Sequence, residues 1–272
     1  MSLAVALVQT RTPATQAAAL AHLEPLIEEA IAGGAKLVVT PEGSNLLQRS
    51  RARFVEEASD AAEDEVVRMA ERVARSRQVF ILLGSALLRR ADGLFANRSF
   101  LFGPAGLVAT YDKIHMFDVD LPTGERHRES AVYAPGQAAV VAETPLGRLG
   151  LSICYDIRFP HLYRRLAKAG AAMIAIPAAF TRPTGEAHWE VLLRARAIET
   201  GAFVLAPAQG GFHEDGRGTW GRSTIVGPWG EIIAKADHDE PCVVAASLDL
   251  EAVAKARAAI PALAHDRDFD GP

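Results

Sequence analysis

The chain has 272 residues, of which 49% are hydrophobic and 23% charged, and its formal net charge is −4. Its lysines and arginines are scattered, which excludes a basic face for nucleic acid or anionic lipid, and no apolar run is long enough to span a bilayer. Two cysteines and the lack of a signal peptide before the first apolar run indicate a reducing compartment, so we expect a cytoplasmic protein that binds neither nucleic acid nor membrane.

The first part of the chain alternates short apolar runs with helical patterns. Strands are predicted at residues 3–8, 37–39 and 79–83, the last closed by Gly84, and a hairpin at 98–102 and 107–111. The first helix is predicted to begin after an N-cap at Thr12 and to end at Gly33-Gly34, and Pro25 predicts a kink or a late start. A second helix is predicted over residues 63–77.

The second part of the chain is rich in strands. Residues 114–136 are polar and irregular, and loops of that length are usually functional or disordered. Helices are predicted at 186–200 and 251–259, a mobile glycine-rich loop at 210–221, and strands at 139–142, 149–153, 171–176, 203–206, 223–226, 231–234 and 243–248. Since no linker or repeat divides the chain, we predict one α/β domain over residues 1–272, with residues 251–272 as its C-terminal tail.

Cys154 lies where a catalytic nucleophile could be built. An apolar strand ends at Ile153, the chain turns at 154–156, and Pro160 lies near the start of a helix. The oriented N–H groups of a helix's first turn would favour thiolate over thiol. A buried structural cysteine is the alternative, and this segment alone leaves both open.

A nucleophilic thiol needs a base, and the sequence offers more than one kind. None of the eight histidines lies in a setting that favours it as the base, although a Cys–His pair could still form in space, and no two have the helical spacing of metal ligands. Glu42 follows a strand behind Pro41, where open α/β sheets place ligand sites. Lys113 ends another strand. Either residue, taken singly, is also consistent with a solvated strand end.

Taken together, three segments resemble the nitrilase superfamily of carbon–nitrogen hydrolases, whose Glu–Lys–Cys triad has this chain order. They are Thr40-Pro41-Glu42, Tyr111-Asp112-Lys113-Ile114-His115 and Cys154-Tyr155-Asp156-Ile157-Arg158-Phe159-Pro160. Further matching blocks lie at 187–190, 194–199 and 227–230, so the resemblance spans nearly the whole chain. It implies a four-layer αββα sandwich of two mixed sheets with helices outside, a homodimer or higher homo-oligomer, and neither a cofactor nor a metal.

The resemblance also implies roles for individual residues. Glu42 would be the general base, its pKa raised by burial and lowered by Lys113, and Lys113 would stabilise the oxyanion with the backbone N–H of Tyr155. Glu129 would orient Lys113 or shuttle protons, unless it is a surface glutamate. Arg158 would anchor a substrate carboxylate or form an ion pair with Asp156. Phe117 and Phe180 complete the expected substrate-binding residues.

Blocks 113–120 and 187–200 look closest to the ω-amidase and deaminated-glutathione amidase branch. The implied reaction is hydrolysis of the terminal amide of a small carboxylate-bearing substrate through a thioester. The alternatives are an N-carbamoyl amino acid hydrolase or nitrilase of the same superfamily, an inactive metabolite-binding protein on the same fold, and a cysteine–histidine peptidase on another. Gly43-Ser44-Asn45 depart from the family, which often has an aromatic residue there, so one pocket wall would be smaller or more polar.

Overall fold

Two six-stranded sheets packed face to face form the centre of the molecule in a computed structural model, which describes residues 2–121 and 124–271. The first sheet has the order β16-β1-β2-β3-β4-β5 and the second β15-β14-β11-β10-β9-β8. The bounds in the first sheet are β1 Ser2–Gln9, β2 Leu37–Val39, β3 Phe80–Arg89, β4 Phe95–Gly103, β5 Gly106–Asp112 and β16 Cys242–Asp249. Those in the second are β8 Val140–Thr144, β9 Gly147–Leu151, β10 Met173–Ala175, β11 Phe203–Ala206, β14 Thr224–Val226 and β15 Ile232–Lys235.

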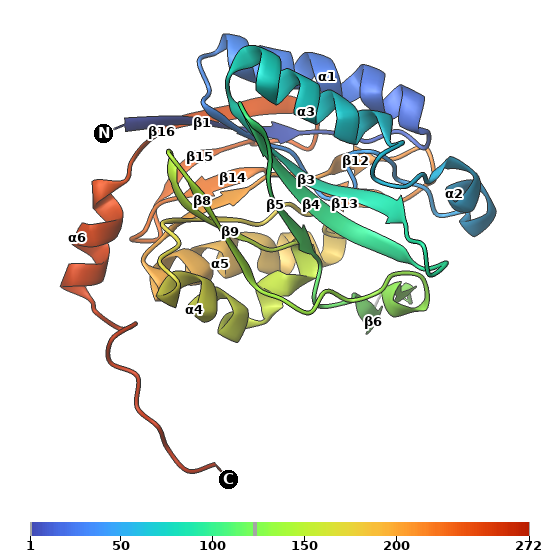
Figure 1. Ribbon diagram of the computed structural model, residues 1–272. Helices are drawn as coiled ribbons and strands as arrows, with labels where there is room; N and C mark the ends of the chain where they lie inside the picture. Colours follow the sequence, from blue (N-terminus) through green and yellow to red (C-terminus); the bar gives the residue numbers. More distant parts are fainter. Residues whose placement is uncertain (1, 122–123, 272) are drawn as a thin grey trace.

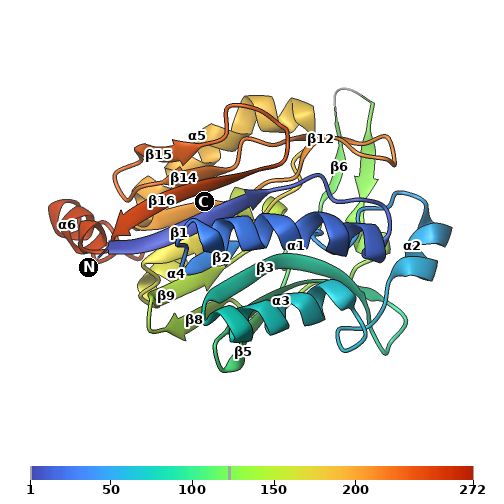
Figure 2. The same ribbon diagram turned by 90° about the horizontal axis from the view of Figure 1, so that it is seen from above.

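Helices cover the outer face of each sheet, as Figures 1 and 2 show. Helices α1 (Gln16–Ala32) and α3 (Glu65–Arg77) lie on the first sheet, and α4 (Pro160–Lys168) and α5 (Arg182–Thr200) lie on the second. Both sheets are mixed, with parallel pairing in β1–β2–β3 and β9–β10–β11 and antiparallel pairing elsewhere. The predicted four-layer αββα sandwich is therefore confirmed.

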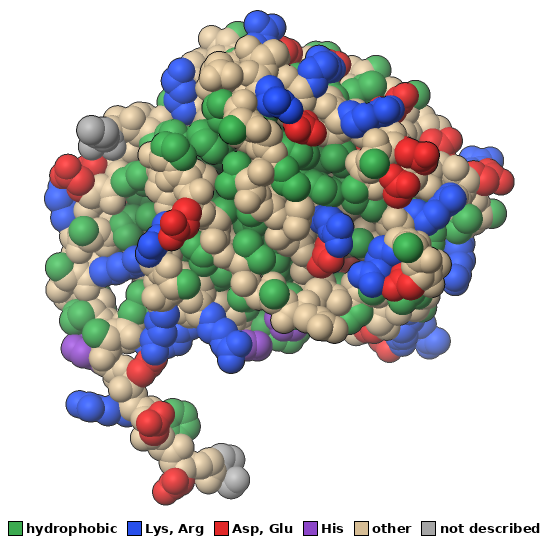
Figure 3. All heavy atoms as spheres, viewed as in Figure 1, with side chains coloured by type: hydrophobic (Ala, Val, Ile, Leu, Met, Phe, Trp, Pro, Cys, Tyr) green, Lys and Arg blue, Asp and Glu red, His purple; other side chains and the backbone are tan. Residues whose placement is uncertain are grey.

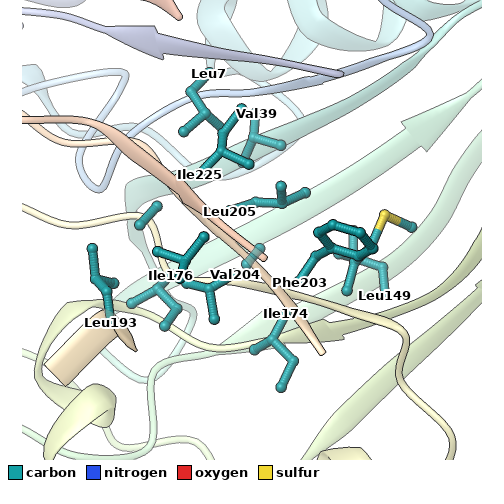
Figure 4. Close-up of a cluster of buried hydrophobic side chains, with 14 of the residues drawn as sticks. Leu7, Val39, Leu149, Ile174, Ile176, Leu193, Phe203, Val204, Leu205 and Ile225 are labelled. Atoms are coloured by element: carbon teal, nitrogen blue, oxygen red, sulfur yellow. The ribbon is translucent and has the colours of Figure 1, made fainter. Parts of the chain in front are cut away.

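The core between the sheets is built from alternate side chains of the facing strands. Leu7 and Val39 of the first sheet face Ile225 and Leu205 of the second (Figure 4), and all four are buried. Each such side chain contributes about 1.5–3 kcal/mol on burial, so the two sheets are held firmly together. A rigid sandwich of this kind fixes where the strand ends, and the side chains beyond them, come to lie.

Three predicted boundaries were wrong, two of them because a tertiary contact overrides a local pattern. Helix α1 is capped by Thr15, whose hydroxyl accepts from the N–H of Ala18, whereas Thr12 is hydrogen-bonded to Gln209. The helix then runs on through Pro25 without a late start. Strand β3 continues past Gly84, with a shift of register between Leu83 and Ala86, and α5 begins at Arg182 rather than at residue 186.

The two predicted loops contain regular structure. The 114–136 segment, of which residues 122–123 lie outside the described part, holds the two-stranded ribbon β6 (Asp118–Asp120) and β7 (Arg126–Arg128), followed by the 3-10 helix η1 (Glu129–Ala131). The glycine-rich loop forms the hairpin of β12 (Gly210–Phe212) and β13 (Gly218–Trp220). A short helix that the sequence did not predict, α2 (Arg51–Glu57), lies between β2 and α3.

The C-terminal segment leaves the body of the molecule after α6 (Glu251–Ala259), the helix predicted there. Beyond α6 the tail is tied to α4 by contacts of Asp266 with Arg164 and Lys168, and Pro272 lies outside the described residues. On the face drawn in Figure 3, basic and acidic side chains are interspersed. No helix within residues 2–121 and 124–271 is long and apolar enough to cross a membrane. The single domain over 1–272 stays a prediction.

Candidate active site

Residues from both sheets meet at one end of the sandwich. Glu42 lies in the turn that follows β2, and Lys113 comes directly after β5 in the same sheet. From the second sheet, Cys154 opens the 3-10 helix η2 (Cys154–Arg158), which follows β9. Glu129 of η1 completes the group. The site is thus assembled from strand ends that only the packing of the two sheets brings together.

Lys113 is buried between two carboxylates. Its Nζ lies 2.9 Å from Oε1 of Glu42 and 2.8 Å from each carboxylate oxygen of Glu129. Only 2% of the Lys113 side chain and 9% of the Glu42 side chain are exposed. Backbone groups hold the acids as well, since the N–H of Ala179 donates to Oε2 of Glu42 and that of Phe117 to Oε2 of Glu129. The structure therefore brings these predicted residues into one hydrogen-bonded cluster.

Asn97 of β4 also belongs to this cluster, although the sequence did not predict it as a site residue. Its Nδ2 donates to Oε1 of Glu42 at 2.9 Å and to Oε1 of Glu129 at 3.4 Å. The backbone of the same residue accepts from the N–H of Lys113. Asn97 lies in the polar run Asn97-Arg98-Ser99 within β4, and nothing in that run distinguishes it in sequence.

Cys154 is held in an unusual backbone conformation beside Glu42. Its φ is +49°, a left-handed value that costs a non-glycine residue free energy, and its N–H donates to the carbonyl of Pro177. Burial and then the Glu42 carboxylate raise the pKa of the thiol well above its usual value, although Lys113 opposes them. The expected stabilisation of a resting thiolate was wrong, because the thiol is buried beside the Glu42 carboxylate, and both effects favour its neutral form.

The charges in the cluster stabilise one another. Burial alone would raise the pKa of Glu42, but the Lys113 charge and hydrogen bonds from Cys154, Lys113 and Asn97 bring it below its usual value. Burial would lower the pKa of Lys113, yet the carboxylates of Glu129 and Glu42 raise it well above its usual value. The balance expected for Glu42 therefore falls on the side of the ionised acid, which is ready to accept a proton.

Asp156 ties the nucleophile's turn to the segment that carries Lys113. Its fully buried carboxylate accepts from Tyr111 Oη at 2.6 Å, from the N–H of Ile153 at 2.9 Å and from the N–H of His115 at 3.0 Å. Nδ1 of His115 lies 2.7 Å from the same carboxylate. The suggested ion pair with Arg158 is absent from the described contacts, because Asp156 points inward and Arg158 does not.

Arg158 lies over aromatic rings at the edge of the site. Its guanidinium is 5.9 Å from the ring of Tyr155 and 5.6 Å from that of Phe180, and its Nη2 lies 3.2 Å from Nδ1 of His188. Phe117 packs against Tyr155 with ring centroids 5.1 Å apart. Of the three predicted substrate-binding residues, Arg158 and Phe117 therefore lie against Tyr155, next to the nucleophile, whereas Phe180 is buried against Trp189 and contacts the group through Arg158. In the described part of the chain, Arg158 contacts no carboxylate.

Several other predicted features take on defined places. Ser44 and Asn45 are buried; Ser44 is hydrogen-bonded to Thr40 within the Glu42 turn, whereas the Asn45 amide contacts Asp64 and the N–H of Leu87. The expected smaller or more polar pocket wall stays a prediction. Cys242 is a free, half-buried thiol in β16. Among residues 2–121 and 124–271, no cluster of His, Cys, Asp and Glu could hold a metal ion.

Comparison with known proteins matches residues 4–258 to the carbon-nitrogen hydrolase family model. The deaminated glutathione amidase of Yersinia enterocolitica is 42% identical over 252 residues, which cover 91% of this chain and 87% of that protein. The omega-amidase NIT2 of Xenopus tropicalis is 38% identical over 237 residues, covering 87% of this chain and 84% of that one.

Solved structures show the same fold. The NitFhit protein of C. elegans superposes with a TM-score of 0.90 at 31% identity, covering 98% of this chain and 65% of that longer one. Saccharomyces cerevisiae Nit3, described as a member of branch 10 of the nitrilase superfamily, gives a TM-score of 0.85 at 29% identity, covering 96% of this chain and 94% of that one.

Proposed function

The chain belongs to the carbon-nitrogen hydrolase family and is a hydrolase of carbon–nitrogen bonds other than peptide bonds, and we propose that it is a thiol-dependent amidase. Its substrate would be the terminal amide of a small carboxylate-bearing molecule, such as deaminated glutathione or the ω-amide of a 2-oxo acid. One observation carries the proposal: buried Glu42 is paired with Lys113 at 2.9 Å and lies beside the Cys154 thiol, so that a base, a cation and a nucleophile meet in one cluster.

In the first half-reaction, the Glu42 carboxylate takes the proton of Cys154 as the sulfur attacks the amide carbonyl carbon. The high pKa of the resting thiol means that proton transfer and attack are coupled, which suits a base already in contact with it. The proton then passes to the leaving nitrogen, the C–N bond breaks, and ammonia or an amine departs. A thioester on Cys154 remains.

The negative charge on the carbonyl oxygen would be stabilised by Lys113 and by the backbone N–H of Tyr155. An ammonium group has three hydrogens. If one is given to Glu42 and one is shared by the two oxygens of Glu129, the third is available for the oxyanion. Losing one such donor typically lowers the rate by roughly a hundredfold or more.

In the second half-reaction, a water attacks the thioester while Glu42 accepts its proton. Glu129 is better suited to orienting Lys113 than to shuttling protons. Its two oxygens already accept hydrogen bonds from Lys113, and one also accepts from the N–H of Phe117 at 2.6 Å. A carboxylate so engaged holds the ammonium of Lys113 in place.

The preference for a carboxylate-bearing substrate rests on Arg158. Its guanidinium is positioned by two aromatic rings and by His188, with no acidic partner among the described residues, and a guanidinium can bind a carboxylate through two hydrogen bonds. The names of the two amidase relatives agree with such a substrate class. Hydrolysis of an N-carbamoyl amino acid or a nitrile is the alternative chemistry for the same residues.

The proposal is tested by incubating wild-type protein, Cys154→Ala and the control Cys242→Ala with ω-amides, N-carbamoyl amino acids and nitriles and measuring ammonia. We expect release from ω-amides by wild type and Cys242→Ala, and loss of release in Cys154→Ala. Intact-mass spectrometry should detect an acyl adduct in the two active proteins only. Equal ammonia release by Cys154→Ala and wild type would refute the assignment of the nucleophile, and turnover of nitriles alone would refute the amidase assignment. Release from no substrate class by wild-type protein would favour an inactive binding protein.

Two further expectations remain predictions. Exposed apolar side chains on α5, the β14–β15 turn, β15 and α6 agree with self-association into a homodimer or higher oligomer; they are Val191, Ile198, Trp229, Ile232, Ile233 and Ile260. Light scattering coupled to size-exclusion chromatography tests this expectation, and a monomeric mass at micromolar concentration would contradict it. The expected cytoplasmic location is tested by fractionating cells.

A further inference from the structure

Asn97 carries a hydrogen-bonding group that is left without a partner. The residue is 3% exposed, and its Oδ1 is buried without any hydrogen-bond partner in the described structure. Its Nδ2, by contrast, contacts both Glu42 and Glu129. Leaving a buried carbonyl unpaired is unfavourable, so such a group in a native protein calls for a physical reason.

The reason lies in what surrounds the amide nitrogen. An NH2 group has two hydrogens, one for each carboxylate, whereas the opposite amide orientation would direct Oδ1 at two anionic oxygens. The two acids therefore set the orientation of the Asn97 side-chain amide, and its Oδ1 then points to a position where it meets no donor. The cluster holds two negative charges and one positive charge, and Asn97 adds donors to it without adding charge.

A second buried asparagine provides a contrast within the same molecule. Asn45 also donates to a carboxylate, Asp64, at 2.7 Å, but its Oδ1 accepts from the N–H of Leu87 at 2.8 Å. Both ends of that amide are satisfied, as expected where an asparagine contributes to stability. In Asn97, by contrast, Nδ2 contacts the two acids of the active site while Oδ1 has no hydrogen-bond partner.

We propose that Asn97 is a positioning residue of this hydrolase, whose amide group holds Glu42 and Glu129 on either side of Lys113 so that Glu42 faces the Cys154 thiol. The inference rests on the proposed function, since it assumes that Glu42 is the base. Without the amide, Oε1 of Glu42 would keep only Lys113 as a described partner. The carboxylate would still be held by Lys113 and by the N–H of Ala179, but less tightly, so that it could shift relative to the thiol. A misplacement of about 1 Å can lower a rate roughly a hundredfold.

The test compares Asn97→Leu, which has a similar shape and no donor, with the matched control Asn45→Leu. We expect Asn97→Leu to lower kcat by about tenfold to a hundredfold with little change in KM. The acid limb of kcat/KM should move to higher pH, because a lost hydrogen bond to the ionised form raises the pKa of Glu42. The other titratable groups around Glu42, which both proteins retain, are Lys113, Glu129, Cys154 and Tyr133.

A second readout needs no substrate. The rate of alkylation of Cys154 by iodoacetamide, followed by peptide mapping that separates it from Cys242, should show the same shift of its acid limb in Asn97→Leu. Asn45→Leu should lower the melting temperature more than Asn97→Leu does, because it unpairs Asp64 and the N–H of Leu87, and should leave both pH profiles unchanged.

The outcomes separate the inference from the proposed function. Wild-type kcat and pH profiles in Asn97→Leu, alongside an inactive Cys154→Ala, would overturn the role of Asn97 alone. Undiminished ammonia release by Cys154→Ala would overturn the proposed function. If Asn97→Leu does not fold, Asn97→Asp serves as the second variant because it keeps the shape and replaces the donor with a carboxyl oxygen. It should lower kcat and shift the acid limb in the same direction, and wild-type behaviour would again overturn the inference.

Discussion

Replacing Asp156 with alanine should uncouple the nucleophile's turn from the segment that carries Lys113. The carboxylate accepts hydrogen bonds from Tyr111 Oη, the N–H of Ile153, and the N–H and ring of His115. The His115 ring is 17% exposed on its side chain and can turn toward water. The donors of Tyr111 and Ile153 are fully buried and would be left unpaired.

The magnitude follows from those two donors. Each unpaired buried donor costs about 1–3 kcal/mol, so Asp156→Ala should lose about 4 kcal/mol of a total stability of roughly 5–15 kcal/mol. For a chain of this size that corresponds to a fall in Tm of roughly 10 °C. Tyr111→Phe, which removes only one of the donors to the carboxylate, should lose about 1–2 kcal/mol.

The assay combines calorimetry with the rate of alkylation of Cys154 at a temperature where all variants are folded. Asp112→Ala is the matched control, because Asp112 is adjacent to Lys113 but pairs with the half-exposed Arg98 instead of contacting the nucleophile's turn. We expect Asp156→Ala to change both Tm and the reactivity of the thiol, and Asp112→Ala to change them little. A Tm for Asp156→Ala within about 2 °C of wild type would refute the reasoning.

Three further outcomes are expected. Burial lowers the pKa of His213 from 6.5 to about 4, so the unfolded chain binds a proton in that window that the folded chain does not. Stability measured by urea unfolding should therefore fall by about 3 kcal/mol from pH 6.5 to 4, and a slope as steep in His213→Gln would contradict this. Gly84→Ala should unfold or misfold the protein, since a Cβ would lie 1.8 Å from the carbonyl oxygen of Thr40. Gly33→Ala, with its nearest contact at 3.4 Å, should be tolerated. Circular dichroism and thermal melting compare the two variants, and a melting curve of Gly84→Ala like that of wild type would contradict the close approach. Arg158→Met should raise KM for carboxylate-bearing amides by roughly tenfold to a hundredfold and leave neutral amides unaffected, and equal increases for both in steady-state kinetics would exclude the carboxylate contact.

The strands and the α/β class followed from short apolar runs and from helical patterns with clear ends, whereas the four-layer sandwich followed from the family resemblance. What the sequence could not show was where the chain makes close contacts between elements. Gly84 looks like the end of a strand, yet β3 continues through it, because glycine is needed there for the approach of Thr40. Thr12 looks like a helix cap, but its hydroxyl accepts a hydrogen bond from Nε2 of Gln209 in the other half of the chain.

The site shows the same division between local and tertiary information. Glu42, Lys113 and Cys154 follow strand ends, but each local pattern left a structural alternative open, and only the family resemblance of the three segments together selected them. Asn97 lies within a strand, and only its contacts with two acids distinguish it from any buried polar residue. The ionisation of the cluster was also beyond the sequence, because the pKa of Glu42 depends on three hydrogen bonds formed by residues far apart in the chain.

The pairing of β1 with β16 has a consequence for how the protein is made. Ser2 lies opposite Asp249 and Gln9 opposite Cys242. The outer edge of β1, the first strand to be synthesised, therefore stays unpaired until β16, near the end of the chain, has been synthesised. An apolar strand with an open edge can join another chain. We expect nascent chains stalled before β16 to remain bound by chaperones, because the outer edge of β1 is unpaired until that strand has emerged.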